Sequence, residues 1–201
     1  MTEKRHIDPE RAANRRRQVL DAAATCFRRS GFHGASMSEI SKAAGMSAGH
    51  IYNYFASKDA IIAAFVEENE TRVHEIISNI GSQPDPLQAI IDDVEQSVHN
   101  NLDPDHWALP LEIAAESARN PAIAALSQDA DRRMCASLLA LLKAGREKHG
   151  LPADDSTVEG RMQAVICLHQ GLQLRVLNYP DLPLPELISS FRIAMRALLF
   201  T

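Results

Sequence analysis

The chain has 201 residues, of which 45% are hydrophobic and 23% are charged, and its formal net charge is −5. This composition excludes a disordered protein and suffices for one large domain, or for a small module joined to a larger one. Cys26, Cys135 and Cys167 lie in apolar helical patterns without a Cys-x-x-Cys pair, which argues against a disulfide framework and a zinc knuckle. The polar start, residues 1–8, and the lack of any run of ~18 apolar residues lead us to expect a cytoplasmic protein.

The charge is distributed unevenly along the chain. Residues 1–58 contain ten Lys or Arg and five Asp or Glu, a balance of +5, which leaves −10 for the remainder. A basic end beside an acidic body is typical of a phosphate-binding module attached to a separate domain, because only the surface that faces DNA needs to be positive. The alternative is a chance asymmetry of solvated helix faces.

Helical periodicity predicts an all-α fold. The first helix runs from Pro9 to Gly31, two short helices follow within residues 36–55, and Ser57 caps a long fourth helix that ends near Gly81. Proline and glycine punctuation divides the rest into helices at about residues 85–101, 105–118, 121–149, 155–178 and 184–200. We therefore expect an N-terminal three-helix domain, residues 9–58, joined by the long helix to a larger all-helical domain, residues 59–201.

Residues 36–58 predict two short capped helices around a glycine turn. Ser36 and Glu39 have the spacing of a capping box, Gly45 ends the first helix, and Ser47 offers an N-cap to the second. This is the layout of a helix-turn-helix that reads DNA. The side chains expected to face inward are Ile40, Ala43, Ala44, Ile51 and Phe55.

The segment from Ile40 to Lys58, after a helix that ends in Gly31-Phe32, resembles the N-terminal domain of TetR-type (TetR/AcrR) transcriptional regulators. The similarity covers roughly residues 15–65. The Gly45 turn, the Ile-Tyr-x-Tyr-Phe ending and the following lysine occur together at the spacing of the family, whereas Met46 stands where the family more often has Val.

This resemblance implies a homodimeric, ligand-responsive regulator, a repressor released from a palindromic DNA operator by a small-molecule effector. The larger domain would then bind the effector and dimerise. An enzyme is not expected, and neither is a cofactor, because the chain lacks a phosphate loop, a Gly-x-Ser-x-Gly elbow and a His-Glu-x-x-His motif. The alternative is a helical ligand-binding adaptor whose helix-turn-helix contacts another protein.

The resemblance also assigns residues to the DNA interface. His50 and Asn53 can hydrogen-bond base edges in the major groove. Lys58, in the first turn of a helix, is disfavoured by the helix dipole by ~0.3–1 kcal/mol unless an anion such as a phosphate lies opposite; a solvated lysine is the alternative. The predicted DNA-binding residues are Ser36, Ser38, Ser47, Ala48, Gly49, His50, Tyr52, Asn53, Tyr54 and Lys58.

A basic run precedes the helix-turn-helix. Arg15, Arg16 and Arg17, with Lys4 and Arg5 upstream, are expected to hold flanking phosphates or to enter a minor groove. A merely solvated charged face is the alternative.

The last two predicted helices each have an apolar side, and Gly171 lies within the first of them at a cost of about 0.5–1 kcal/mol relative to alanine. Two such helix pairs would form a four-helix bundle across a twofold axis. Packing within a single chain is the alternative. The residues predicted at the dimer interface are Met162, Val165, Ile166, Leu187, Phe191, Met195 and Leu198.

A cavity for an effector is predicted between the middle helices. Glu112 and Glu116 share one helical side, and they would favour a cationic or amphiphilic effector if they point inward. A metal site built from His99, Asp103, Asp105 and His106 lacks a defined ligand spacing. The residues predicted to line the cavity are Phe65, Trp107, Leu111, Met134, Leu138 and His169.

Overall fold

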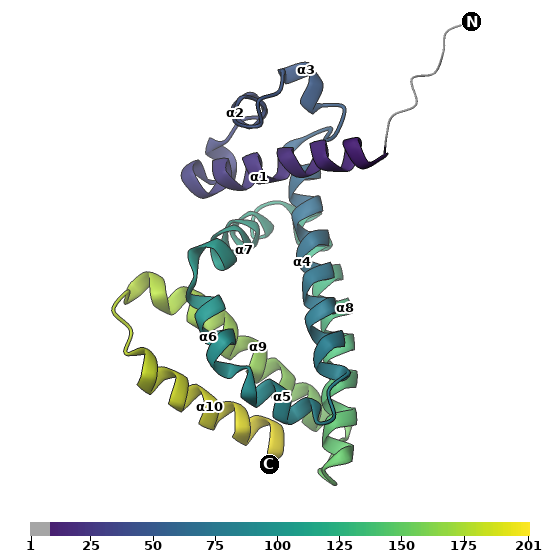
Figure 1. Cartoon of the computed structure of the whole chain (residues 1–201), viewed down its shortest axis with the longest axis vertical. Helices are drawn as coiled ribbons and strands as arrows, with labels where there is room; N and C mark the ends of the chain where they lie inside the picture. Colours follow the sequence, from purple (N-terminus) through teal and green to yellow (C-terminus); the bar gives the residue numbers. More distant parts are fainter. Residues whose placement is uncertain (1–8) are drawn as a thin grey trace, which may run out of the picture. The chain divides into compact units, whose positions relative to one another are not determined.

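The structure, a computed structural model, describes residues 9–201, and within that range it consists of ten α-helices without a strand (Figure 1). The predicted all-α class is confirmed. The helices are α1 (Pro9–Gly34), α2 (Met37–Ala43), α3 (Ala48–Ile51), α4 (Lys58–Gly81), α5 (Pro86–Asp92), α6 (Val94–Leu102), α7 (Pro104–Ser117), α8 (Pro121–Lys148), α9 (Asp155–Asn178) and α10 (Leu184–Phe200).

Two expectations fall on residues 1–8, namely the polar start of the chain and the contribution of Lys4 and Arg5, and they lie outside the described residues. Within residues 9–201, no helix combines the length and the apolar character that a membrane crossing requires.

The helix expected at residues 85–101 is two helices. Asp93, with φ −82° and ψ −4°, ends α5 and precedes α6, and its backbone N–H donates to the Ala89 carbonyl. The apolar periodicity continues through this break, which is why the sequence pattern did not reveal it.

Contacts between residues divide the chain into two compact units. Within the described chain, unit 1 comprises the residues up to Glu68 together with Ala108–Ser127, and unit 2 comprises Asn69–Trp107 and Gln128–Thr201. Unit 1 thus includes the first turns of α4 and most of α7. The domain boundary predicted between residues 58 and 59 stays a prediction.

Unit 1 has its own apolar core beneath the helix-turn-helix. Phe27 packs against Phe32 and Phe65, with ring centroids 5.4 and 6.2 Å away. Burial of these rings and of the aliphatic side chains around them fixes α1, α2, α3 and the start of α4. The larger side chains in this core are Val19, Leu20, Phe27, Phe32, Ile40, Ile51, Phe55, Ile61, Ile62 and Phe65.

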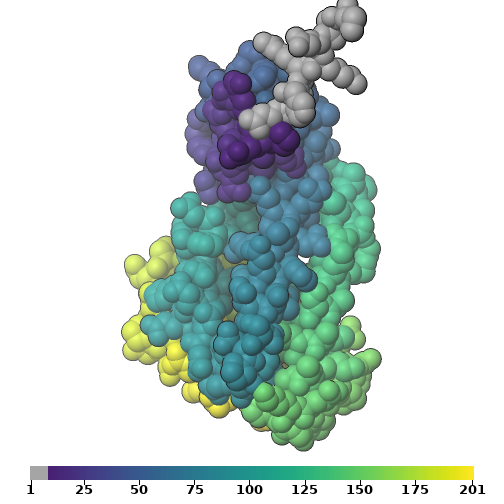
Figure 2. All heavy atoms as spheres, turned by 45° about the vertical axis from the view of Figure 1, so that its right-hand side comes forward, coloured from purple at the N-terminus to yellow at the C-terminus, as the bar shows by residue number. Residues whose placement is uncertain are grey.

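Unit 2 packs α5, α6, α9 and α10 around one apolar cluster, to which α8 contributes Leu142. In the same unit the later turns of α4 run beside α8 (Figure 2). Arg133 of α8 donates to Glu70 of α4 over 2.7 Å, and a Cβ at Gly81 would lie 3.2 Å from Leu141.

Candidate nucleic-acid interface

The helix-turn-helix is built from local signals that the structure confirms. The Ser36 hydroxyl accepts from the Glu39 N–H over 3.1 Å, and the Glu39 carboxylate accepts from the Ser36 N–H over 2.8 Å. The carboxylate also accepts from the Ser36 hydroxyl over 3.1 Å, and the two bonds that it accepts from Ser36 lower the pKa of the Glu39 carboxyl. Gly45 takes a positive φ of 61° in the turn, a conformation that side chains with a Cβ disfavour.

The second helix of the motif is short and anchored from below. The Ser47 hydroxyl accepts from the His50 N–H over 3.3 Å, as expected for its N-cap. Beyond α3, backbone bonds from Tyr54 and Phe55 to the Ile51 carbonyl continue the turn. Ile51 and Phe55 are buried, as predicted.

One expectation for the inner face of α2 is wrong. Ile40 and Ala44 are buried, but Ala43 is exposed and Ser41 takes the inward position instead. The Ser41 hydroxyl donates to the Ser38 carbonyl over 2.9 Å, so its burial leaves no unpaired donor.

The residues predicted to read DNA lie on the outer side of this scaffold. Asn53 and Tyr54 both reach toward His50, with Asn53 Nδ2 3.4 Å from His50 Nδ1 and Tyr54 Oη 3.4 Å from His50 Nε2. Contacts this long are weak, so base edges can replace them. The exposed members of the predicted set are Ser36, Ser38, Ser47, Ala48, Gly49, His50, Tyr52 and Asn53, and Tyr54 is half-buried.

Lys58 has partners within the protein, and they offer an alternative to the predicted phosphate contact. Its ammonium donates to the carbonyls of Phe32 and Ala35 over 2.7 and 2.8 Å, and lies 4.5 Å from the centroid of the Phe32 ring. A cation at the C-terminal end of α1 satisfies free carbonyls and opposes the negative end of the helix dipole. The anion-like partner that the sequence required is therefore the end of α1.

We expect Lys58→Met to lower the free energy of unfolding by about 2 kcal/mol, because two charge-assisted hydrogen bonds are removed at a half-buried position. The salt dependence of DNA binding should stay unchanged. Urea denaturation and binding titrations at several salt concentrations measure the two effects, with the exposed Lys42→Met as the matched control. A smaller slope of log Kd against log salt, with an unchanged free energy of unfolding, would support a contact between Lys58 and a DNA phosphate.

The three consecutive arginines differ in their partners. Arg16 lies 3.9 Å from Glu67 and its guanidinium carbon 4.5 Å from the centroid of the Phe55 ring. Arg17 donates to Asp21 and to Glu68 of α4 over 3.1 and 3.3 Å. Arg15 instead donates to Gln18 over 2.7 Å, and Gln18 Nε2 donates to the Ala44 carbonyl over 2.7 Å. Gln18 thus connects α1 to the end of α2.

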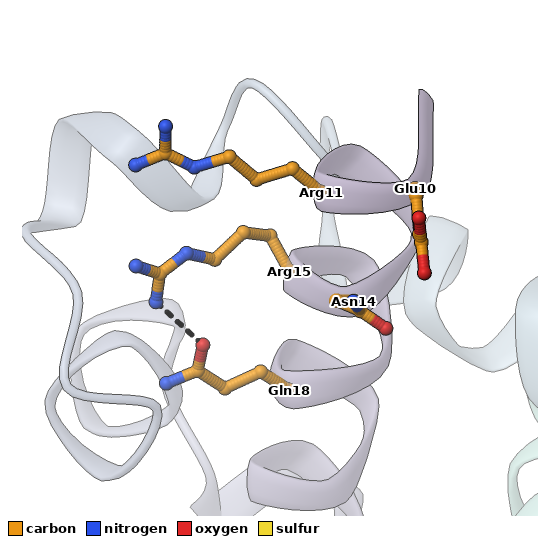
Figure 3. A pocket seen from close by; sticks show the side chains of 5 residues that line it. All are labelled: Glu10, Arg11, Asn14, Arg15 and Gln18. Carbon is orange, nitrogen blue, oxygen red and sulfur yellow. Dashed lines mark hydrogen bonds between the residues drawn. The ribbon is translucent and has the colours of Figure 1, made fainter. Parts of the chain in front are cut away.

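The part of α1 around Arg15 lines an open recess of about 390 Å³. Arg11, Arg15 and Gln18 extend from one side of the helix, whereas Glu10 and Asn14 point away from them (Figure 3). Spacings of four and three residues place Arg11, Arg15 and Gln18 on one helical face. The sequence reasoning missed Arg11 and Gln18, although this spacing was visible in it.

Carboxylates of α7 hold the end of α1 in unit 1. Helical geometry breaks at Gly31, with φ 67° and ψ 169°, and the freed N–H of Phe32 donates to Glu112 over 3.1 Å. The Glu116 carboxylate is buried, 2.9 Å from His33 Nε2 and 3.6 Å from Arg119. The two acids predicted beside an effector instead bind the N-terminal domain.

The cavity candidates are distributed over both units. Phe65 and Leu111 belong to unit 1, where Phe65 packs in the core, so the prediction that Phe65 lines a cavity is revised. Trp107 donates to the Leu102 carbonyl over 3.2 Å, and Met134 is half-buried. Leu138 packs against the unit 2 core.

His169 belongs to a polar contact between α6 and α9. Its Nδ1 lies 2.9 Å from the Val165 carbonyl and its Nε2 3.0 Å from Ser97 Oγ. Burial lowers the pKa of this imidazole. Since a backbone carbonyl only accepts, Nδ1 carries the proton and Nε2 accepts from Ser97 in the neutral ring. Among the described residues, no group of three or more His, Cys, Asp or Glu could hold a metal ion.

The side chains predicted at the dimer interface pack within their own chain. Met162, Val165, Phe191 and Met195 are buried in the unit 2 core, and Ile166, Leu187 and Leu198 pack against that core. The four buried side chains are therefore not available to a second copy, whereas the half-buried Ile166, Leu187 and Leu198 stay predicted interface residues. The large apolar side chains that α9 and α10 do expose are Leu174, Leu177 and Ile193.

Two family descriptions match the chain. "Bacterial regulatory proteins, tetR family" matches residues 19–65, and "BetI-type transcriptional repressor, C-terminal" matches residues 86–198. The HTH-type transcriptional regulator UidR of Escherichia coli K12 is 28% identical over 148 residues, 71% of each chain.

Solved structures share the fold over nearly the whole chain. Salmonella enterica GusR is 28% identical, with a TM-score of 0.71 over 92% of this chain and 95% of its own. A transcriptional regulator from Pseudomonas aeruginosa PAO1 is 24% identical, with a TM-score of 0.76 over 96% and 92%.

Proposed function

The chain belongs to the TetR family of bacterial regulatory proteins, and from this premise we propose that it is a homodimeric repressor that a small-molecule effector releases from a palindromic DNA operator. Members of this family are transcriptional regulators, so the chain is a regulator and not an enzyme. The name of the matching C-terminal family, a BetI-type repressor, supports repression over activation.

The arrangement around α3 is the observation that carries the proposal. Ile51 and Phe55 are buried, while His50 and Asn53 of the same turns are exposed and make only weak contacts with each other. Polar side chains on a rigid base are what major-groove readout requires. The same face serves the adaptor alternative less well, because a protein partner would favour apolar side chains at its centre.

Dimerisation is supported by the free face of α9. Gly160, Ala164, Cys167, Gly171 and Leu174 follow one another at intervals of three or four residues, and a Cβ added at either glycine would meet nothing within 4 Å. The cost of Gly171 is therefore not explained by packing within the chain. We place the interface on this face and on the exposed face of α10 around Ile193, each against a second copy.

Response to a ligand is supported by the position of α7. Pro104–Trp107 group with unit 2 and the rest of α7 groups with unit 1, where Glu112 and Glu116 bind the end of α1. An effector that favours one position of α7 in unit 2 would therefore act on the N-terminal domain through these carboxylates. The chemical class of the effector stays open.

The first experiment is selection of bound fragments from genomic DNA, followed by binding titrations at low and high salt. A regulator selects sequences and loses affinity steeply as salt rises. Absence of both properties would support the adaptor alternative and contradict the proposed function.

We expect His50→Ala and Asn53→Ala each to weaken binding to the selected operator by about 5- to 150-fold, or ~1–3 kcal/mol, because each removes a hydrogen bond to a base edge. Binding to random DNA should change little, because base readout adds nothing there. Competition titrations with both DNAs measure the ratio, and Ser38→Ala on the same exposed surface tests how local the effect is. Equal losses on the two DNAs would count against base readout by these residues.

A further inference from the structure

We propose that Arg11 and Arg15 form a binding site for a phosphate of the DNA backbone, and that Gln18 is the positioning residue that aims Arg15 into it. This inference rests on the proposed DNA-binding function and adds a site outside the helix-turn-helix. Of the four arginines in the first half of α1, it assigns Arg16 and Arg17 to contacts within the protein and Arg11 and Arg15 to DNA.

The arginines in the first half of α1 differ in whether a carboxylate faces them. Arg16 and Arg17 each face a carboxylate of α4, Glu67 and Glu68, so their charge ties α1 to α4. Within residues 9–201, by contrast, the structure gives Arg11 and Arg15 no ion pair. Two guanidinium groups one helical turn apart repel each other, and an anion that lies between or beside them offsets this repulsion.

The recess along this face of α1 is open and has room for an anion. Its volume of about 390 Å³ easily admits a phosphate group, and the two guanidinium groups extend into the space beside Gln18 (Figure 3). Glu10 and Asn14 also line the recess, but their side chains point away from the two guanidinium groups (Figure 3). Paired guanidinium forks match the oxygens of a phosphate in geometry and in charge.

Gln18 connects the recess to the helix-turn-helix. Gln18 accepts from Arg15 and donates to the Ala44 carbonyl, at the C-cap of α2, only a few residues before α3 begins. An amide that bridges α1 and α2 fixes one Arg15 rotamer before DNA binds. Binding then costs less side-chain conformational entropy. A duplex that lies on α3 would therefore present its backbone to the recess, and such contacts set affinity and register, not sequence preference.

The test measures the salt dependence of the dissociation constant of the full chain for a random-sequence duplex and for the selected operator. We expect Arg11→Ala and Arg15→Ala each to reduce the slope of log Kd against log salt by about 0.9 for each phosphate that is no longer neutralised, or about 1.8 per dimer, on both DNAs alike. Arg17→Ala is the matched control, since it removes the same charge from the same helix and should leave the slope nearly unchanged.

Two further variants separate positioning from charge. Gln18→Met keeps the net charge but removes the partner of Arg15, so it should weaken binding to both DNAs. Arg15→Lys keeps the positive charge, so it should retain most of the slope of log Kd against log salt. Equal slopes for Arg11→Ala, Arg15→Ala, Arg17→Ala and the unaltered protein would overturn the phosphate site while leaving DNA binding intact. Failure of the unaltered protein to bind DNA would instead refute the proposed function. Circular dichroism establishes that each variant is folded.

A final arm identifies the source of the phosphate. Inorganic phosphate at millimolar concentration, added at constant ionic strength, should compete only weakly with the duplex if the site is built for the DNA backbone. Strong competition that disappears in Arg15→Ala, together with an unchanged salt slope, would assign the recess to a free phosphorylated compound and overturn its assignment to DNA.

Discussion

The Ile193→Asp protein is expected to stay folded, to become monomeric and to bind the operator about 1,000-fold more weakly or worse, equivalent to ~4 kcal/mol. Ile193 is 69% exposed in the single chain, so the substitution disturbs no internal packing. In a dimer the same side chain would be buried, and two carboxylates would meet across the twofold axis without water. A monomer presents only one α3 helix to DNA, so it cannot bind the second half-site of a palindrome.

Sedimentation at micromolar concentration and operator titrations measure these effects. Ile76→Asp, at another exposed isoleucine on α4, is the matched control and should leave both properties unchanged. Phe191→Asp should behave differently, because Phe191 is buried against His169 and the substitution should unfold unit 2. An Ile193→Asp dimer with normal operator affinity would move the interface away from α10.

The second large effect is expected at Arg146, which is only 1% exposed. Its guanidinium donates to the carbonyls of Pro152, Leu199 and Thr201 over 2.7, 2.8 and 2.9 Å, and thereby fixes the end of α10. Burial, and then the neighbouring Arg161, lower the pKa of this guanidinium, which nevertheless stays charged at neutral pH. Arg146→Met would leave three carbonyls without their donor, so we expect it to lower the free energy of unfolding by about 3–5 kcal/mol.

Urea denaturation measures this destabilisation, with Arg161→Met as the control. Arg161 is half-buried and donates to the Leu198 carbonyl over 3.0 Å, so its removal should cost about 1 kcal/mol, since water can replace it. Equal destabilisation of the two variants would show that burial of Arg146 adds nothing to its hydrogen bonds.

The predicted caps and the glycine turn of the helix-turn-helix were confirmed. The Ser36–Glu39 capping box, the Ser47 N-cap and the positive φ of Gly45 each follow from bonds or sterics within a few residues. The long fourth helix beginning after Ser57 follows from its cap and from apolar periodicity. The resemblance to TetR-type regulators rested on this same local segment, and the family matches confirmed it.

The partner of each side chain was decided only by the tertiary structure. Periodicity identified the apolar side around Phe191, but an apolar side looks the same whether its own chain or a second copy covers it. A negative partner was predicted for Lys58 as a DNA phosphate, and the structure shows that the carbonyls at the end of α1 also contact its ammonium. Among the arginines, Glu67 and Glu68 of α4 neutralise Arg16 and Arg17 but not Arg15. Local patterns predict helices because helix hydrogen bonds and caps join residues within a few positions of each other. The pairings above join residues far apart in the sequence, and only packing brings them together.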